Sequence, residues 1–166
     1  MMLKQDDPAK CTAAKLAKFG IADAVRMPKR DSIVLNPFSE SPILRSDANI
    51  ATSICAIDCS WERAEEVLRY RSVISRGIMR RLPALLAANP VNYSKLSKLT
   101  TAEALAAGLY VLGDVNASER VMNKFKWGHT FFELNIEPLK EYSLAENDNQ
   151  IKAIEESYFQ QLRHDL

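Results

Sequence analysis

The sequence predicts an α/β protein with a parallel sheet in its N-terminal part and helices throughout its C-terminal part. Two short apolar runs, residues 32–35 and 53–57, each end at a polar or proline-containing turn, which is typical of buried parallel strands. A third such run follows at residues 82–88, and downstream of it the apolar residues recur at helical spacing. We therefore expect an α/β domain over residues 1–81 and a mainly helical domain over residues 82–166.

The N-terminal part is expected to alternate helices with these strands. Asp7-Pro8 and Thr12 each offer a start for a first helix, which ends at Gly20. Asp58 closes the second strand, and a helix is expected after it over residues 60–68. Such an alternation of helix and strand favours a parallel sheet.

The first helix of the C-terminal part has the strongest start signal in the chain. Thr100 and Glu103 form a capping box, in which each residue satisfies a free amide of the other's backbone. The apolar face of this helix would carry Leu105, Leu109 and Leu112.

The rest of the C-terminal part is also expected to be helical. Gly113 stops the first helix, and Asn116 with Glu119 repeats the cap signal for a second. Further helices are expected at residues 130–134, 138–144 and 148–162. Trp127 and His129 are expected to pack within this helical half.

Length and composition describe an ordinary soluble protein. The chain has 166 residues, of which 47% are apolar and 26% charged, so it can build one compact core. The longest apolar run, residues 102–112, is shorter than a membrane span, and the N-terminus lacks the features of a signal peptide. We therefore expect a cytoplasmic monomer with no membrane partner.

The cysteines and histidines do not have the spacing of a metal site. Cys55 and Cys59 have no second cysteine pair, Cys11 stands alone, and the chain holds only two histidines. We expect three reduced thiols and no metal, with Cys59 taking no part in chemistry.

The net charge of +1 is unevenly distributed. Residues 1–81 hold 14 basic against 10 acidic side chains, and residues 82–166 hold 8 against 11. Six arginines fall between residues 63 and 81, a cluster that suits phosphate contacts or simply a solvated loop. The residues expected to contact RNA are Arg69, Arg71, Arg76 and Arg80.

The common nucleotide-binding and hydrolase motifs are absent. The sequence has no G-x-G-x-x-G, no Walker-type loop, no H-E-x-x-H and no G-x-S-x-G, and it contains only five glycines. A nucleotide-like ligand would then be held by backbone groups at strand ends and by apolar side chains. S-adenosylmethionine, which has no phosphate, fits that description.

Six segments resemble a known family in the same order along the chain. They read DDPAKCTAAKLAKFG, VLNPF, IDCSW, RLPALLAANPVNY, KLTTAEALAAGLYVLG and FKWGHTFFELN. They are similar to the archaeal-type small-subunit (16S/18S) rRNA aminocarboxypropyltransferases of ribosome biogenesis. The resemblance implies a SPOUT-like fold with a deep trefoil knot. It also implies transfer of the 3-amino-3-carboxypropyl group of S-adenosylmethionine to N3 of a pseudouridine, usually N1-methylated, in small-subunit rRNA.

The resemblance assigns the carboxylate of S-adenosylmethionine to two helix starts. Thr12 would bind it through its amide and hydroxyl, and Thr101 through its amide. Free amides and the positive end of the helix dipole favour an anion at such places. From the residues alone, Thr12 is more typical of a simple helix cap than of an anion site.

The other cofactor contacts implied by the resemblance lie along the strand ends and the loop before Thr101. The Ile57 carbonyl would meet the ribose, and the Leu82 amide and Ser97 carbonyl would meet the adenine. Apolar packing around the adenine would come from Leu35, Pro37 and Leu99.

The choice of transferred group is expected to depend on residues that follow the second strand. The resemblance implies that Trp61 and Ala64 cover the sulfonium methyl and leave the aminocarboxypropyl carbon facing the RNA. Asp58 is a candidate to accept or orient the N3 proton, although an aspartate there is also a common helix cap. Two alternatives stay open: a SPOUT-type rRNA methyltransferase, and a non-catalytic factor that binds pre-ribosomal RNA.

Overall fold

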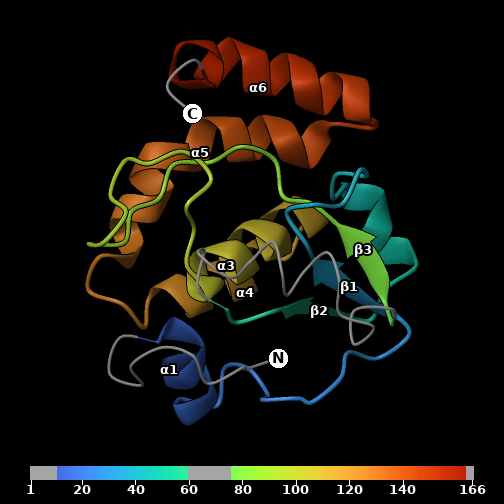
Figure 1. Ribbon diagram of the computed structural model, residues 1–166, viewed down its shortest axis with the longest axis vertical. Helices are drawn as coiled ribbons and strands as arrows, with labels where there is room; N and C mark the ends of the chain where they lie inside the picture. Colours follow the sequence, from blue (N-terminus) through green and yellow to red (C-terminus); the bar gives the residue numbers. More distant parts are fainter. Residues whose placement is uncertain (1–10, 60–75, 164–166) are drawn as a thin grey trace.

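The computed structural model describes residues 11–59 and 76–163, with side chains described as far as residue 161. Helix α3 (Thr101–Leu112) lies at its centre (Figure 1). A small parallel sheet packs on one side of α3, and α5 (Gly128–Leu144) lies on another side with α6 (Asp148–Arg163) beyond it. The predicted α/β class is confirmed.

Within the described residues the sheet has the strand order β2-β1-β3, with parallel pairing throughout. The central strand, β1 (Ser32–Leu35), is buried along its whole length. It pairs with β2 (Ser53–Ala56) on one side and β3 (Ile78–Arg80) on the other. The carboxyl ends of parallel strands meet at one edge of a sheet, so the residues that follow these strands lie close together.

The third strand begins earlier in the chain than predicted. Residues 82–88 are mostly buried but do not belong to the sheet, and within them only Leu86 forms a bridge, antiparallel to Leu96. The prediction was wrong because an apolar run indicates burial and does not reveal which groups the backbone bonds to. The partners of this backbone are described below.

The first helix, α1 (Thr12–Lys18), begins one residue after its cap. The cap is Cys11, whose sulfur accepts a hydrogen bond from the Ala14 amide at 3.3 Å. Thr12 is therefore the first helical residue, with its hydroxyl available for another contact. The alternative start at Asp7-Pro8 lies outside the described residues.

The capping box of α3 is confirmed. The Thr100 hydroxyl accepts from the Glu103 amide, and the Glu103 carboxylate accepts from the Thr100 amide at 2.7 Å. The helix ends at Gly113, whose φ of 97° lies in the left-handed region that glycine adopts readily.

Two predicted boundaries in the helical part are wrong. Helix α4 (Val115–Met122) is capped by Asp114, whose carboxylate accepts from the Ala117 amide at 2.9 Å, and not by Asn116. Helix α5 runs without a break through Pro138, although two helices were expected. A proline costs one hydrogen bond in a helix, and burial of the neighbouring turn of α5 in the core compensates for it.

Small residues let α3 pack closely against the sheet. Its fully buried positions are mainly alanines, and a Cβ added at Gly108 would come within 2.3 Å of the Ile54 side chain. The predicted apolar face of Leu105, Leu109 and Leu112 is only half-buried. The helix thus approaches the sheet through its small residues, and its leucines lie beside that contact.

One apolar core extends across the boundary expected at residues 81 and 82. It includes Leu16 and Ile33 from the N-terminal part together with Leu85, Val111 and Tyr142 from the C-terminal part. Among the described helices, none is both long and apolar enough to cross a membrane.

Candidate active site

Three distant parts of the chain meet at the carboxyl end of β2. Asp58 lies just past that strand, and its carboxylate accepts a hydrogen bond from the Thr101 hydroxyl at 2.9 Å and from the Cys11 thiol at 3.2 Å. The Ala102 amide donates to the Thr12 hydroxyl at 3.2 Å, which joins the first turns of α1 and α3 directly. We call this group of residues the helix junction.

The helix junction is buried and has a positive electrostatic character apart from Asp58. Asp58 is 8% exposed and Thr12 is also 8% exposed. Each helix start carries free amides and the positive end of a helix dipole, so two starts side by side favour an anion. The Asp58 carboxylate supplies one negative group. The Ala14 and Ala102 amides already donate to side chains, whereas no described residue accepts a hydrogen bond from the Thr12 or Thr101 amide, which leaves these two amides for a second anion.

Cys11 stays protonated in this setting. Burial raises the pKa of its thiol, while the hydrogen bond from the Ala14 amide opposes the shift and the neighbouring Asp58 carboxylate adds to it. A protonated thiol is the form that donates to Asp58. No feature of the sequence marked Cys11 as part of the site, because its partner lies 47 residues away.

The predicted adenine contacts lie along residues 82–99 and at the end of β1. Leu35 and Leu99 are buried in the main core, and Leu82 packs against it. No described residue accepts a hydrogen bond from the Leu82 amide. Ser97 has a φ of 57°, unusual for a residue with a side chain, and its amide donates to the Leu85 carbonyl at 2.8 Å. Pro37 is exposed.

The remaining predicted residues beside the second strand are only partly described. Ile57 is half-buried and packs with Val34 and Cys55. Trp61, Ala64, Arg69 and Arg71 lie outside the described residues. The geometry therefore brings together Thr12, Asp58 and Thr101, and leaves the cover over the sulfonium methyl as a prediction.

The two described arginines that were expected to contact RNA differ in their exposure and in their partners. Arg76 is exposed. Arg80 donates from Nε and Nη2 to the buried carboxylate of Asp47, at 3.0 and 2.9 Å. A guanidinium held in this way stabilises the fold and has little freedom to reach a phosphate. The geometry therefore favours a structural role for Arg80 over the predicted contact with RNA. Its partner Asp47, 33 residues away, could not be recognised in the sequence.

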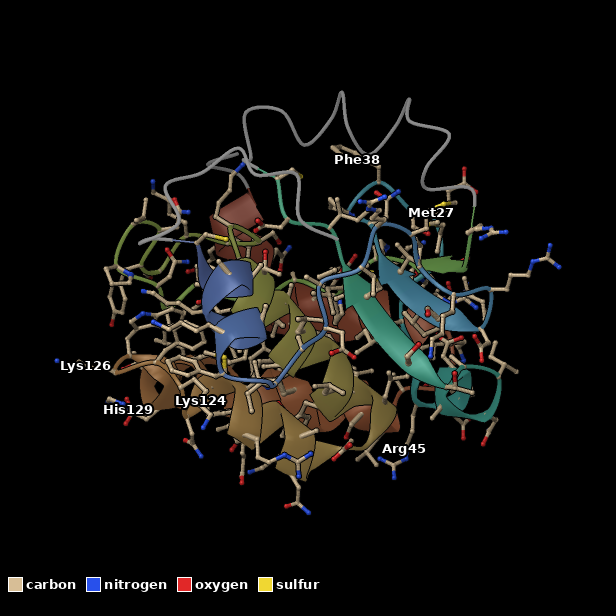
Figure 2. The ribbon with its side chains drawn as sticks, turned by 90° about the horizontal axis from the view of Figure 1, so that it is seen from below. Met27, Phe38, Arg45, Lys124, Lys126 and His129 are labelled. Carbon is tan, nitrogen blue, oxygen red and sulfur yellow. The ribbon has the colours of Figure 1, made fainter. Side chains whose placement is uncertain are left out.

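Basic side chains also project from the connection between α4 and α5 and from the first turn of α5. Lys124, Lys126 and His129 are exposed there (Figure 2). The Lys124 ammonium lies 5.9 Å from the centre of the exposed Phe19 ring. The expectation that His129 packs inside the helical half is wrong, whereas Trp127 does pack against Phe125, with ring centres 5.2 Å apart.

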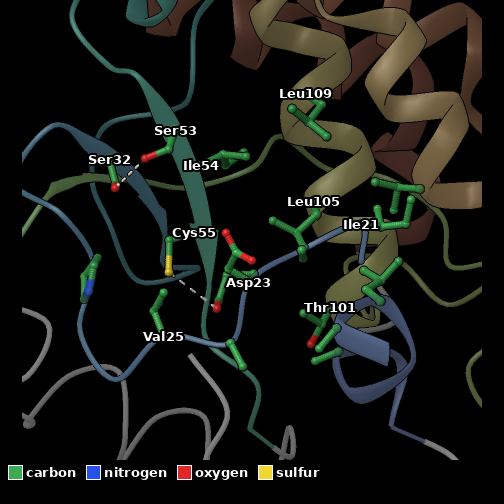
Figure 3. A pocket seen from close by; sticks show the side chains of 18 of the residues that line it. Ile21, Asp23, Val25, Ser32, Ser53, Ile54, Cys55, Thr101, Leu105 and Leu109 are labelled. Atoms are coloured by element: carbon green, nitrogen blue, oxygen red, sulfur yellow. Dashed lines mark hydrogen bonds between the residues drawn. The ribbon is translucent and has the colours of Figure 1, made fainter. Parts of the chain in front are cut away.

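A groove of about 480 Å³ lies beside the helix junction and does not coincide with it. It runs along β2 between the segment after α1 and the half-buried Leu105 and Leu109 of α3 (Figure 3). Among the described residues that line it, Thr101 is the single predicted site residue. We place the candidate site at the junction, because the convergent polar groups are there and the walls of the groove are mainly apolar.

Comparison with known proteins identifies the family. A family profile described as "Ribosome biogenesis protein, C-terminal" matches residues 33–159. The 16S rRNA aminocarboxypropyltransferase of Methanococcoides burtonii is 42% identical over 93% of this chain and 90% of that protein. The enzyme of the same name from Thermoplasma volcanium is 43% identical over 96% of both chains. The chain belongs to the 16S rRNA aminocarboxypropyltransferase family.

A solved structure of an rRNA acp-transferase has a fold similar to that of this chain. The SAM-dependent rRNA acp-transferase Tsr3 from Vulcanisaeta distributa matches with a TM-score of 0.78 and 35% identity over 94% of each chain. The aminocarboxypropyltransferase resemblance seen in the sequence is thus confirmed at the level of family and α/β fold. The trefoil knot stays a prediction.

A second profile, described as a possible Fer4-like domain in RNase L inhibitor, matches residues 3–30. Iron–sulfur clusters of ferredoxin type are held by four cysteine thiolates, and this stretch contains Cys11 alone. In the structure the Cys11 sulfur caps α1 and bonds to Asp58. The stretch does not by itself supply the ligands of such a cluster.

Proposed function

We propose that this chain transfers the aminocarboxypropyl group of S-adenosylmethionine to 16S rRNA during ribosome biogenesis. Family membership supports the reaction, and the helix junction is the observation that supports its location. A transferred group that carries a carboxylate needs an anion site, and two adjacent helix starts provide one.

The first-turn amides of Thr12 and Thr101 bind the carboxylate of the transferred group. The target is N3 of an N1-methylated pseudouridine. A bond forms between N3 and the aminocarboxypropyl carbon while the bond from that carbon to sulfur breaks. The bonding electron pair stays on sulfur, which leaves as methylthioadenosine, and the N3 proton passes to a base. Asp58 is the proposed base, since each carboxylate oxygen accepts one hydrogen bond and keeps another lone pair.

The adenosine part lies against the strand ends. The Leu82 amide and Ser97 carbonyl hold the adenine between Leu35, Pro37 and Leu99, and the Ile57 carbonyl holds the ribose. Trp61 and Ala64 cover the methyl group, which directs attack to the other carbon. The backbone around this site forms the trefoil knot, and the chain acts as a monomer.

A labelling experiment tests the reaction. Small-subunit rRNA that carries the N1-methylated pseudouridine and lacks the aminocarboxypropyl group is incubated with S-adenosylmethionine labelled either in the carboxyl carbon or in the methyl carbon. Carboxyl label in the RNA is the expected result. Methyl label would replace the proposal with a methyltransferase, and the absence of either label would replace it with an RNA-binding factor.

The rRNA contacts come from Arg69, Arg71 and Arg76. Replacing Arg76 by alanine is expected to lower the slope of log affinity against log salt concentration by about one, because one phosphate contact is lost. Arg80→Ala is the matched control: the slope stays unchanged, and stability falls by about 2 kcal/mol because Asp47 loses its partner. Equal salt slopes for the unmodified chain and Arg76→Ala would remove Arg76 from the RNA surface.

A further inference from the structure

Buried side chains from three helices take the place of a neighbouring strand along residues 84–89. The Ala84 carbonyl accepts from the Tyr142 hydroxyl at 3.0 Å, and the Ala84 amide donates to Glu155 at 2.9 Å. The Ala88 and Asn89 amides donate to Glu103 at 2.6 and 3.0 Å. Tyr142, Glu155 and Glu103 belong to α5, α6 and α3, respectively.

Asn135 of α5 makes the most complete of these contacts. Its side chain accepts from the Leu86 amide at 2.8 Å and donates to the Leu86 carbonyl at 2.9 Å, which copies the pairing of one strand residue with another. It also donates to the Phe131 carbonyl at 2.9 Å. Asn135 is fully buried, so a lost contact would leave backbone groups without water as a substitute.

The other edge of the same segment holds the loop that contains Ser97. The Ser97 amide donates to the Leu85 carbonyl at 2.8 Å, and the Ser94 amide donates to the Ala87 carbonyl at 2.7 Å. Residues 84–89 are therefore fixed on one edge by helix side chains and on the other by the returning chain. Any shift of the helix side chains would move both Leu82, two residues before the segment, and Ser97, beside it.

We propose that Asn135 and Tyr142 are positioning residues for the adenine end of the site. Neither is assigned a contact with S-adenosylmethionine. By holding Leu86 and Ala84 they set the distance between the Leu82 amide and the Ser97 carbonyl, and so they determine affinity for the adenosine moiety. This inference rests on the proposed function, because it takes these two backbone groups as the adenine contacts.

Methylthioadenosine provides the test, because it retains the adenosine and lacks the carboxylate. Asn135→Asp places oxygens opposite the Leu86 and Phe131 carbonyls, and it is expected to weaken binding of both S-adenosylmethionine and methylthioadenosine by about tenfold in calorimetric titrations. Tyr142→Phe removes a single hydroxyl and keeps the ring. It is expected to weaken binding of each of the two ligands by about threefold. In both variants the transfer rate at saturating S-adenosylmethionine stays unchanged.

Ser118→Ala is the matched control, because it also removes a buried hydrogen bond in the helical half, from the Ser118 hydroxyl to the Ala106 carbonyl. It is expected to lower the melting temperature without changing either affinity. If Asn135→Asp fails to fold, Tyr142→Phe alone decides the question. If Asn135→Asp and Tyr142→Phe bind both ligands with the same affinity as Ser118→Ala, this inference is wrong and the proposed function still stands. An unmodified chain that binds neither ligand would overturn the proposed function and this inference together.

Discussion

The two ends of the candidate site are built in opposite ways. At the helix junction, the side chains of Cys11, Asp58 and Thr101 bond to one another and bring two helix starts together. Along residues 84–89, side chains from the helices bond instead to the backbone of an extended segment. In both places the hydrogen-bonding groups proposed to hold S-adenosylmethionine belong to the backbone. Side chains therefore decide where those backbone groups lie, and substitutions at the two ends should have separable effects.

Glu103 links the two ends, so its replacement should have the largest effect. Its carboxylate accepts five hydrogen bonds, from the amides of Ala88, Asn89 and Thr100, the Asn89 side chain and the Thr100 hydroxyl. Glu103→Gln replaces one accepting carboxylate oxygen by an NH2 group, which cannot accept the hydrogen bonds donated to that position. This change is expected to lower the free energy of unfolding by about 3 kcal/mol. Denaturant unfolding measures this loss.

Glu119→Gln is the control for that substitution, because Glu119 is exposed on α4. It is expected to change stability by less than about 0.5 kcal/mol. Equal stability of the two variants would show that the carboxylate of Glu103 does not hold the segment and the helix start together.

Asp58→Asn should break the helix junction while leaving the extended segment intact. An amide nitrogen cannot accept the hydrogen bond that Cys11 or Thr101 donates, and an amide does not serve as a base. The expected result is a fall in kcat/KM of about 100-fold with methylthioadenosine binding unchanged. Steady-state transfer assays and titrations measure the two quantities.

The control for Asp58→Asn is Asp31→Asn. Asp31 precedes β1, at the opposite end of the sheet, and bonds to the Thr52 hydroxyl at 2.6 Å. Its variant should keep full activity. If Asp58→Asn transfers at the normal rate, Asp58 is neither the base nor needed to orient the base.

Thr101→Val gives the sharpest contrast with the Asn135 variants. It keeps the shape of the side chain and removes the hydroxyl that bonds to Asp58. The Asp58 carboxylate keeps the hydrogen bond from Cys11 but loses the one from Thr101, and so opposes a second anion nearby more strongly. The affinity for S-adenosylmethionine should therefore fall about tenfold. The affinity for methylthioadenosine should stay constant in titration. An equal loss for both ligands would mean that the junction does not bind the carboxylate.

Cys11→Ser should have the smallest effect, visible mainly at alkaline pH. Burial raises the pKa of the Cys11 thiol above its ordinary value of 9.0, so the folded state binds this proton more tightly than the unfolded state does. The stabilisation is complete below that value and is lost as the pH rises through the raised pKa. Serine does not titrate in this range.

The measurement for Cys11 is the melting temperature between pH 7 and pH 10.5. The unmodified chain should lose stability above about pH 9 more steeply than Cys11→Ser. Parallel curves for the two chains would show that the thiol does not couple to folding.

Much of the fold could be predicted because its signals are local. The capping box at Thr100 and Glu103, the glycine stop at Gly113 and the two apolar runs at β1 and β2 all depend on neighbouring residues. The prediction that Thr12 and Thr101 share a site followed from the family resemblance, whereas Asp58 was a candidate because of its place at the end of a strand, near Trp61. The structure brings these three residues together.

The misses have a common cause. Residues 82–88 have the composition of a strand, yet their partners are side chains such as Asn135, 49 residues beyond Leu86. Arg80 belongs to an arginine cluster, yet its partner Asp47 lies 33 residues before it. Periodicity and charge patterns describe a residue's own segment and contain no information on which distant side chain it meets.

The sequence by itself determined the α/β class, the capped start of α3 and the family, because apolar periodicity, caps and motifs are properties of adjacent residues. Only the tertiary structure decided that Cys11 bonds to Asp58 and that Asn135 takes the place of a strand. The physical reason is burial. Polar groups removed from water must find partners inside the protein, and the packing of α1, α3 and α5 determines which partners are within reach.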